Sequence, residues 1–325
     1  MRMRMKVPAV LVGLMLALPG DAAEVMRLGH IMSPKHQVHL TAQKFADEIK
    51  ARTNGAVEIQ LFPSGQLGQE KEMFESMRLG SLELGFIAGN AIESFEPSEG
   101  IFSLPYAFVD YEHIYRVQDG PVGKEIARRV LEKTGIRYLA YGNIGFRHTL
   151  TLAKPVRTPA DFVGLKIRVP PSPAFVSAFK LLGANPTPIP GGEMYTALKT
   201  GVVDGVEGAP DILLDFKMFE VAKQYSLTGH IYTDIPLVIP DRLWKAMTPD
   251  RQKAFAEAAR AAELYERDLI KQGEGAMFDK LRKDGVDIVK VDTAPMRAKM
   301  TPYYDDFAKR IGGMALIEQA VAAGK

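Results

Sequence analysis

Two hydrophobic periods alternate along this chain, and that alternation restricts its fold more than any other feature. Apolar residues occupy every second position in Val57–Leu61 and across Leu82–Ala88, which is the period of a strand. The segments Val38–Ile49 and Gln69–Leu79 have helical patterns instead. With a further strand at Met26–His30, the order is β-α-β-α-β. That order favours a mostly parallel sheet with helices on both faces.

The pattern starts again after residue 135 and predicts a second α/β unit. We expect strands at Ile136–Tyr141, Phe146–Leu152 and Leu165–Val169 and from Val206, and helices at Pro173–Leu182 and Glu193–Thr200. The 325 residues are too many for one minimal domain and fit two lobes of ordinary size.

The C-terminal part of the chain is predicted to tie the two units together. Thr233–Ile239 is an extended apolar stretch that returns to the first unit, and Pro249–Arg282 has the pattern of one very long helix. At about 1.5 Å per residue, a helix of that length reaches from one lobe to the other. Met296–Ile311 and Met314–Ala323 are predicted terminal helices.

The expected fold is therefore α/β, with two lobes, a hinge and a long bridging helix. Lobe I is predicted to hold residues 24–145 and 234–273, and lobe II residues 146–233 and 274–325. Several segments then cross between the lobes, which restricts their relative motion to opening and closing about a hinge.

The N-terminus has the composition of a secretory signal peptide. Three basic residues precede the apolar run Val7–Pro19, which is too short to span a bilayer comfortably, and small residues follow it. We predict residues 1–23 to be a signal peptide that is cleaved after Ala22 or Ala23. The alternative is a short membrane anchor. The predicted destination of the mature chain is the periplasm.

Charge and cysteine content exclude several classes of function. The leader holds three of the 41 Lys and Arg and one of the 39 Asp and Glu, so the mature chain keeps 38 of each and a net charge near zero. A basic surface for nucleic acid or anionic lipid is therefore not expected. The chain has no cysteine, which excludes disulfides, zinc–thiolate sites, cysteine nucleophiles and a bacterial lipid anchor.

No catalytic or cofactor motif stands out. The sequence contains no G-x-S-x-G, H-E-x-x-H, G-x-x-x-x-G-K or G-x-G-x-x-G motif. Of the six histidines, only His36 and His39 lie close at helical spacing, and an exposed helix start is a commoner role for them than a metal site. We therefore predict no catalytic residue, no metal and no cofactor.

Two arginines are the strongest candidates for chemistry. Arg147 lies in the strand-like stretch Gly145–Thr149, and Arg168 lies in Leu165–Val169 on the strand face opposite the apolar residues. The end of a strand in an open α/β lobe is where ligands usually bind. A guanidinium offers two parallel donors that match a carboxylate. From composition alone, a surface or salt-bridged role for each arginine is the open alternative.

Five segments, in this order, give the sequence a resemblance to a known family. They are Phe62–Gly68, Leu104–Phe108, Phe146–Arg147 with Thr149, Gly164–Pro170 and Val203–Glu207. Over nearly all of the mature chain, the sequence resembles the extracytoplasmic solute-binding proteins of tripartite ATP-independent periplasmic (TRAP) transporters, the dicarboxylate-binding-protein family. Gly164–Pro170, followed by Val203–Glu207, is the most specific of these signals.

The resemblance implies a two-lobed periplasmic binding protein fold and a ligand-capturing function rather than an enzymatic one. The ligand is expected to be a small organic acid whose carboxylate is held by Arg168 with the help of Arg147. The resemblance also implies delivery of the acid to TRAP membrane permease subunits. We expect a monomer.

The resemblance also suggests further contacts with the ligand. Glu70 and Asn90 lie in loops where relatives contact the rest of the ligand, although a helix N-terminal charge and a loop turn explain them equally well. Glu207 is expected to orient an arginine or bind a ligand hydroxyl, or else to form an ordinary ion pair. Tyr195 and Phe175 are candidates to line the pocket, with core packing as the alternative.

The sequence leaves the ligand and two other functions open. Gly208 replaces an Asn that many relatives carry, and Gly191 replaces an aromatic residue typical of sialic-acid binders, so sialic acid is disfavoured. C4-dicarboxylates, sugar acids, keto acids and aromatic acids all stay possible. The alternatives to transport are a periplasmic enzyme on a bilobal fold and a ligand-sensing partner of a receptor.

Overall fold

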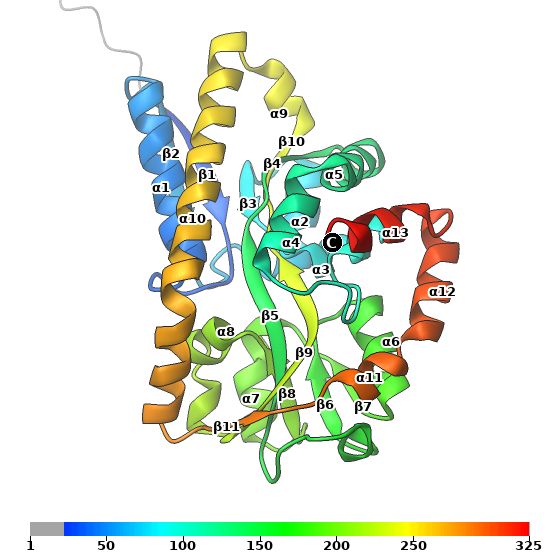
Figure 1. The fold of residues 1–325 in the computed structure, drawn as a ribbon. Coiled ribbons are helices and arrows are strands. Elements are labelled where there is room, and N and C mark those ends of the chain that lie inside the picture. The colour runs from blue at the N-terminus through cyan, green and yellow to red at the C-terminus, as the bar shows by residue number, and fades with distance from the viewer. Residues whose placement is uncertain (1–22, 325) are drawn as a thin grey trace, which may run out of the picture.

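A computed structural model describes residues 23–324 as two α/β lobes stacked one above the other (Figure 1). Apart from Ala23, the predicted signal peptide lies outside the described residues. Within residues 23–324, none of the helices combines the length and the apolar character that crossing a membrane requires. We call the lobe built on the sheet that contains the first strand the first lobe, and the other the second lobe.

The sheet of the first lobe has the strand order β2-β1-β3-β10-β4. Its strands are β1 (Glu24–Gly29), β2 (Val57–Phe62), β3 (Leu84–Phe86), β4 (Ile136–Ala140) and β10 (Leu237–Pro240). The first three strands are parallel, as predicted, but β10 is antiparallel to both β3 and β4. The sheet is mixed because β10 enters it from the second lobe, in the opposite direction.

The sheet of the second lobe has the order β11-β9-β5-β8-β6-β7. Its strands are β5 (Asn143–Thr151), β6 (Lys166–Val169), β7 (Asn185–Pro188), β8 (Gly205–Gly208), β9 (Gln224–Asp234) and β11 (Asp287–Lys290). Strand β5 runs antiparallel to β8 and β9, whereas β6 is parallel to β7 and β8. This order makes β5 and β8 neighbours, which decides the geometry of the site described below.

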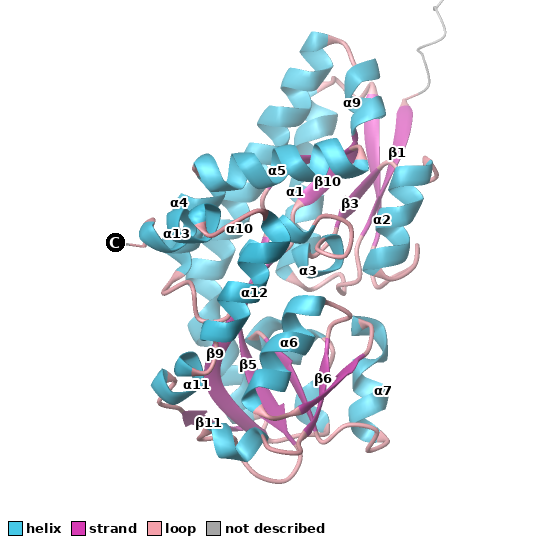
Figure 2. Cartoon of the chain, turned by 90° about the vertical axis from the view of Figure 1, so that its right-hand side faces the viewer, coloured by secondary structure: helices cyan, strands magenta, loops and turns pink. Residues whose placement is uncertain are grey.

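Helices cover both sheets (Figure 2). In the first lobe they are α1 (Gln37–Arg52), α2 (Glu70–Leu79), α3 (Gly89–Ile92), α4 (Tyr111–Asp119), α5 (Pro121–Thr134) and α9 (Asp241–Ala246), with a 3₁₀ turn at Pro97–Ile101. In the second lobe they are α6 (Pro173–Leu182), α7 (Met194–Lys199) and α8 (Pro210–Asp215), with 3₁₀ turns at Pro159–Phe162, Gly191–Glu193 and Met218–Glu220. The α/β fold predicted from the alternating periods is therefore confirmed.

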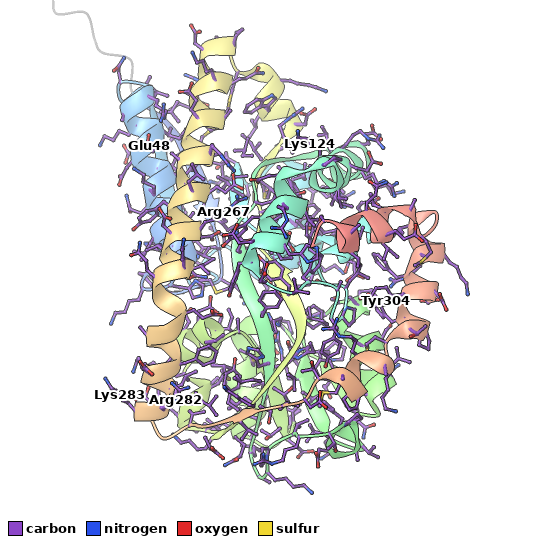
Figure 3. All side chains as sticks on the ribbon, in the orientation of Figure 1. Glu48, Lys124, Arg267, Arg282, Lys283 and Tyr304 are labelled. Carbon is purple, nitrogen blue, oxygen red and sulfur yellow. The ribbon has the colours of Figure 1, made fainter. Side chains whose placement is uncertain are left out.

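The predicted long helix is one continuous helix, α10 (Pro249–Lys283), of 35 residues. Thr248 caps its N-terminus, since the Thr248 hydroxyl accepts a hydrogen bond from the Arg251 amide. The helix runs beside α1 in the first lobe and continues alongside the second lobe (Figure 1). Its basic last turn, which includes Arg282 and Lys283, lies at the far end of the second lobe (Figure 3). Basic side chains there complement the negative end of the helix dipole.

The C-terminal segment differs from the prediction of two helices. Met296–Ile311 is divided into α11 (Ala294–Ala298) and α12 (Thr301–Ile311), and α13 (Ala315–Ala322) follows. Pro302 in the first turn of α12 explains the division, because proline lacks an amide proton and clashes with the preceding helical turn. Helix α12 packs on α6 and α13 packs on α5, so this segment contacts both lobes (Figure 2). The predicted lobe boundaries stay a prediction.

Strands β5 and β9 carry the chain between the lobes, and α10 passes beside them (Figure 1). Where they meet the first lobe, the Ile235 amide donates to the Gly142 carbonyl at 2.8 Å. A side chain at Gly142 would place its Cβ 2.5 Å from the Ile235 carbonyl oxygen, so only glycine permits this approach. The crossing segments are therefore packed backbone against backbone.

Glu266 of α10 fixes this crossing point. Its Oε2 accepts from the Asn143 amide at 2.7 Å and from Asn143 Nδ2 at 3.1 Å. Asn143 Oδ1 in turn accepts from Gln118 Nε2 at 3.0 Å and from the Tyr232 hydroxyl. Glu266 is fully buried, and this burial raises its pKa to about 8 although the Asn143 donors oppose the shift.

We expect Glu266→Gln to make the protein relatively more stable as pH rises. The pKa of Glu266 is higher in the folded than in the unfolded chain, so its stabilising contribution is present below about pH 4.5 and is lost as pH rises through about 8. Glutamine keeps the acceptor but does not titrate. Between pH 5.5 and 8.5, the free energy of unfolding of the variant, measured with urea, should rise by at least about 1 kcal/mol relative to that of wild type. One pKa unit corresponds to about 1.4 kcal/mol.

The matched control is Glu257→Gln, which changes an exposed acid of the same helix. The difference in free energy of unfolding between Glu257→Gln and wild type should stay constant over this pH range. If the same difference for Glu266→Gln were also constant, the assigned role of Glu266 would be contradicted.

Candidate functional site

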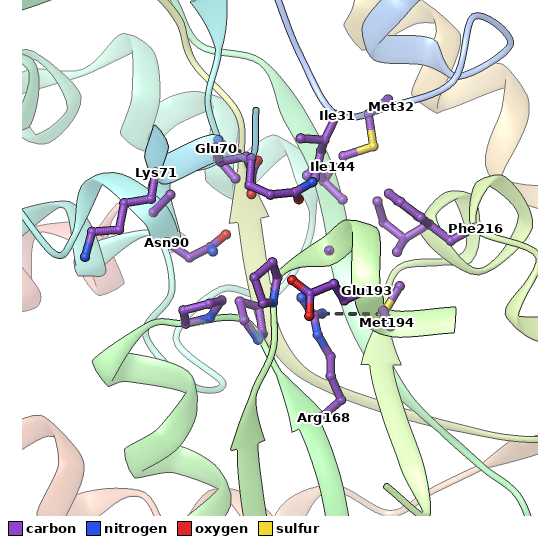
Figure 4. Close-up of a pocket in the computed structure, with 18 of the residues that line it drawn as sticks. Ile31, Met32, Glu70, Lys71, Asn90, Ile144, Arg168, Glu193, Met194 and Phe216 are labelled. Atoms are coloured by element: carbon purple, nitrogen blue, oxygen red, sulfur yellow. Dashed lines mark hydrogen bonds between the residues drawn. The ribbon is translucent and has the colours of Figure 1, made fainter. Parts of the chain in front are cut away.

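A cavity of about 280 Å³ lies between the two lobes (Figure 4). The first lobe lines it with the loop after β1, the start of α2 and α3, and the second lobe lines it with β5, β6 and the segments around α7 and α8. Its apolar wall consists of Ile31, Met32, Ala88, Ala91, Ile144, Pro170, Pro171, Pro190, Met194, Ile212 and Phe216. Four of the predicted site residues also line it, namely Arg168, Arg147, Glu70 and Asn90.

Arg168 reaches the cavity from the carboxyl end of β6, as the alternation of that strand predicts. Its Nε donates to the Ile189 carbonyl at 2.8 Å, and Nη1 lies 3.4 Å from Met194 Sδ (Figure 4). The nearest carboxylate oxygen with which it pairs is Glu207 Oε1, 3.8 Å from Nη1. Within residues 23–324, Nη2 makes no hydrogen bond. The contacts with Ile189 and Met194 thus fix the guanidinium, and Nη2 stays available as a donor toward the cavity.

The charge of Arg168 is only partly compensated. The side chain is 4% exposed, and burial lowers its pKa to about 10, assisted by the neighbouring Arg147 and opposed by Glu207 and Glu70. The group still carries its proton at neutral pH. A buried cation without a directly bound anion is costly, so this position favours an incoming anion.

Arg147, in contrast, already has a carboxylate partner. Its Nε and Nη2 donate to the two carboxylate oxygens of Glu207, the Nη2–Oε1 distance being 2.7 Å. Nη2 also donates to the Glu207 carbonyl at 3.0 Å, and Nη1 lies 3.5 Å from Thr233 Oγ1. The two residues come from the neighbouring strands β5 and β8. Arg147 therefore lines the cavity with its fork occupied.

Glu207 is fully buried and is not among the residues that line the cavity. Burial alone would raise its pKa, but Arg147 and His230, whose Nε2 is 3.3 Å from Oε2, lower it to about 2. Arg147 is buried too, and although burial disfavours its charge, Glu207 outweighs this and raises the pKa of Arg147. The charges of Arg147 and Glu207 stabilise each other, and the positive charge of Arg168 has no carboxylate in direct contact among the described residues.

Glu70 and Asn90 lie on the first-lobe side of the cavity, opposite Arg168 (Figure 4). Glu70 is the first residue of α2, is half-buried, and accepts a hydrogen bond from the Ala88 amide at 3.1 Å. Burial raises its pKa, against the opposing effect of Arg168 and Arg147. Asn90 is 5% exposed, and its side-chain amide has no hydrogen-bond partner among the residues that the structure describes. Both side chains are available to a ligand.

The structure does not bring the two predicted aromatic residues to the cavity. The Tyr195 hydroxyl donates to Glu220 Oε2 at 3.0 Å on the outer side of the second lobe. Phe175 is fully buried under the Arg147 guanidinium, 5.2 Å from its ring centre. Phe175 therefore packs in the core, as the alternative interpretation predicted.

The predicted exposed position of His36 is wrong. The residue is 4% exposed, its Nδ1 accepts from the Val38 amide at 3.1 Å, and its Nε2 lies 3.1 Å from Asp211 Oδ2. Asp211 of α8, in the second lobe, contacts both His36 and Gln37 at the start of α1, and no local pattern reveals these contacts. His39 contacts His30 at 3.1 Å. The described residues contain no group of three or more side chains arranged to hold a metal ion.

Direct contacts between the lobes surround the cavity, and sequence reasoning missed them. Glu93 Oε2 accepts from Ser172 Oγ at 2.6 Å, the Ser33 amide donates to Asp215 Oδ2 at 2.9 Å, and the Gly192 amide donates to Gln69 Oε1 at 3.3 Å. The partners are far apart in the sequence, so spacing gives no signal for them. They indicate that the described conformation has the lobes closed.

Comparison with known proteins gives consistent results. The family model of bacterial extracellular solute-binding proteins, family 7 (DctP), matches residues 28–310. The 2,3-diketo-L-gulonate-binding periplasmic protein YiaO of Escherichia coli K12 is 34% identical over 82% of this chain and 81% of its own length. The C4-dicarboxylate-binding periplasmic protein DctP of Rhodobacter capsulatus is 31% identical, with 97% of both chains covered.

A solved TRAP periplasmic solute-binding protein of Xanthobacter autotrophicus Py2, with bound β-D-galacturonate, has the same fold. It superposes with a TM-score of 0.88 at 34% identity and covers 91% of this chain and 99% of its own. The predicted two-lobed fold and the prediction of a binding protein rather than an enzyme are confirmed. The chain belongs to the bacterial extracellular solute-binding proteins of family 7, the solute-binding proteins of TRAP transporters.

Proposed function

We propose that this protein captures a small hydroxylated organic acid in the periplasm and delivers it to TRAP membrane permease subunits. The observation that carries the proposal is Arg168, a buried guanidinium that faces the interlobe cavity with its nearest paired carboxylate oxygen 3.8 Å away. A ligand carboxylate would supply the missing anion in a geometry that the guanidinium fork matches.

The named relatives support an acid as the ligand. Two of them concern hydroxylated acids with one carboxylate, since YiaO is named for 2,3-diketo-L-gulonate and the Xanthobacter protein holds β-D-galacturonate. The Rhodobacter protein is named for C4-dicarboxylates. We take a single carboxylate next to hydroxyl groups as the ligand chemistry for this chain.

In the proposed mechanism, the open lobes admit the acid and Arg168 binds its carboxylate. Arg147, fixed by Glu207, forms the wall beside it and offers Nη1 at most. Closure excludes water, which strengthens the ion pair. The ligand favours closure only to the extent that it binds the closed form better, through contacts such as those of Glu70 and Asn90 on the opposite lobe.

The proposed lobes are residues 24–145 with 234–273 and residues 146–233 with 274–325, and they open about the crossing of β5, β9 and α10. We propose that the mature protein begins at Ala23 or Glu24, acts as a monomer and docks on the permease in the closed form. The closed lobes then present one continuous surface to the membrane subunits, which distinguishes loaded from empty protein.

We expect Arg168→Ala to weaken acid binding by about 2–5 kcal/mol, because a buried carboxylate loses its partner. Arg168→Lys should also bind poorly, since an ammonium cannot make the forked contact. A thermal-shift screen of organic acids, in which a ligand of the folded state raises the melting temperature, selects the probe for titration calorimetry.

The control is Arg128→Ala, which removes an exposed arginine that pairs with Glu125 on the surface of α5. It should bind like wild type. Near wild-type affinity of Arg168→Ala for the same acid would contradict the proposal.

We expect Glu207→Gln to destabilise the fold by about 3–5 kcal/mol at pH 7, because it leaves Arg147 buried without its counter-charge. The pKa of Glu207 is lowered to about 2 in the folded state, so its stabilising contribution is present above about pH 4.5 and is lost as pH falls through about 2. The difference in free energy of unfolding between Glu207→Gln and wild type, measured with urea, should therefore become smaller as pH falls from 7 to 3.

The double variant Arg147→Met/Glu207→Gln tests whether the cost comes from the unpaired charge. Its loss in free energy of unfolding should be smaller than the sum of the losses in the two single variants. Additive effects would mean that the pair does not act as a unit.

A further inference from the structure

The charged residues of the cavity lining are distributed unequally between the lobes. The second lobe contributes Arg168, the paired Arg147 and the exposed Glu193, whereas α2 of the first lobe contributes the exposed Lys71 and three carboxylates, Glu70, Glu72 and Glu75. Of these three, Glu72 and Glu75 are exposed at the rim, and Glu70 is half-buried. Glu70 lies across the cavity from Arg168 (Figure 4), so an acid held by Arg168 and long enough to span the cavity would reach Glu70 with its far end.

Glu70 is held in place before any ligand arrives. The Ala88 amide donates to its Oε1 at 3.1 Å, and no donor among the described residues binds Oε2. Its backbone is fixed as the first residue of α2, where the positive end of the helix dipole favours a carboxylate. The second carboxylate oxygen is therefore an acceptor that is open to a ligand donor.

The part of the cavity that the structure describes holds no second cation suited to another carboxylate. The fork of Arg147 is occupied by Glu207. Lys71 lies on the rim, is exposed, and has its ammonium 5.9 Å from the Phe95 ring centre. Asn90 is uncharged and offers hydrogen bonds only. A second ligand carboxylate at the far end would therefore face Glu70 without a buried cation among the described lining residues other than Arg168 and the paired Arg147.

We propose that Glu70 is a specificity-determining residue that selects polyhydroxy acids with one carboxylate and rejects acids with a carboxylate at both ends. Its free oxygen accepts a hydrogen bond from the terminal hydroxyl of an aldonate. A terminal carboxylate in the same place brings two negative charges together after closure has excluded water, where repulsion is strongest. This inference rests on the proposed function, because Arg168 must fix the first carboxylate.

Matched acid pairs test the inference, since each pair differs only in a terminal CH2OH or carboxylate group. The probes are D-erythronate with meso-tartrate, D-gluconate with D-glucarate, and D-galactonate with galactarate. Calorimetry at pH 7.5 should show wild type binding the better aldonate at least about tenfold more tightly than its dicarboxylate counterpart, a difference of about 1.4 kcal/mol.

We define the selectivity ratio as the affinity for the aldonate divided by the affinity for its dicarboxylate counterpart. Glu70→Gln should reduce this ratio at least about fivefold, because glutamine keeps the hydrogen-bond acceptor and removes the negative charge. The matched control is Glu58→Gln, an exposed acid on β2 outside the cavity, which makes the same change in net charge and should keep the wild-type ratio. If the Glu70→Gln variant fails to fold, Glu70→Ala takes its place, and a wild-type ratio near one still overturns the inference.

The outcomes separate this inference from the proposed function. Dicarboxylates that bind as tightly as aldonates, with binding lost in Arg168→Ala, would overturn the role of Glu70 and leave the proposed function intact. An unchanged ratio in Glu70→Gln would also overturn it. If no acid of any pair binds wild type and a wider acid screen gives no thermal shift, both the inference and the proposed function fail.

Discussion

The site depends on how one buried carboxylate is shared between two buried guanidiniums. Glu207 binds Arg147 through both of its carboxylate oxygens, and the closest approach of Arg168 to it is 3.8 Å. Among these three groups, two positive charges and one negative charge leave a single positive charge on the second-lobe side of the cavity, while the Glu70 carboxylate lies on the opposite side. The arrangement explains why Arg147 is held by Glu207 and why Arg168 keeps donor capacity toward the cavity.

The same cavity depends on the segments that cross between the lobes. Strands β5 and β9 and helix α10 pass from one lobe to the other, and Glu266 ties the helix to the backbone where β5 begins. Because β5 also carries Arg147, the crossing point and the binding wall belong to one structural unit. The proposed opening of the lobes would therefore move the first-lobe side of the cavity, with Glu70 and Asn90, relative to the second-lobe side that carries Arg147 and Arg168.

Local patterns predicted a large part of this structure because strands and helices depend on neighbours a few residues away. The strands β1, β2 and β6 and the helices α1, α6 and α10 lie close to their predicted bounds. The alternation in β6 was enough to place Arg168 on the face opposite the apolar residues. The helices α3, α4, α5, α8 and α9 and the strands β7, β9 and β11 were not predicted, and of these strands β7 and β11 are short. The two short strands pair only at the edges of the second sheet, where tertiary contacts outweigh their weak local signal.

The sequence by itself determined two α/β units, a long connecting helix and an arginine at the end of a strand, since each follows from periodicity or from a short motif. Only the tertiary structure decided which arginine is free. Arg147 and Arg168 look alike in sequence, but strand β8 lies between β5 and β6 in the sheet and turns Glu207 toward Arg147. Strand order depends on contacts between distant segments, and for that reason the charge balance of the site, the burial of His36 and the outer position of Tyr195 could not be read from local spacing.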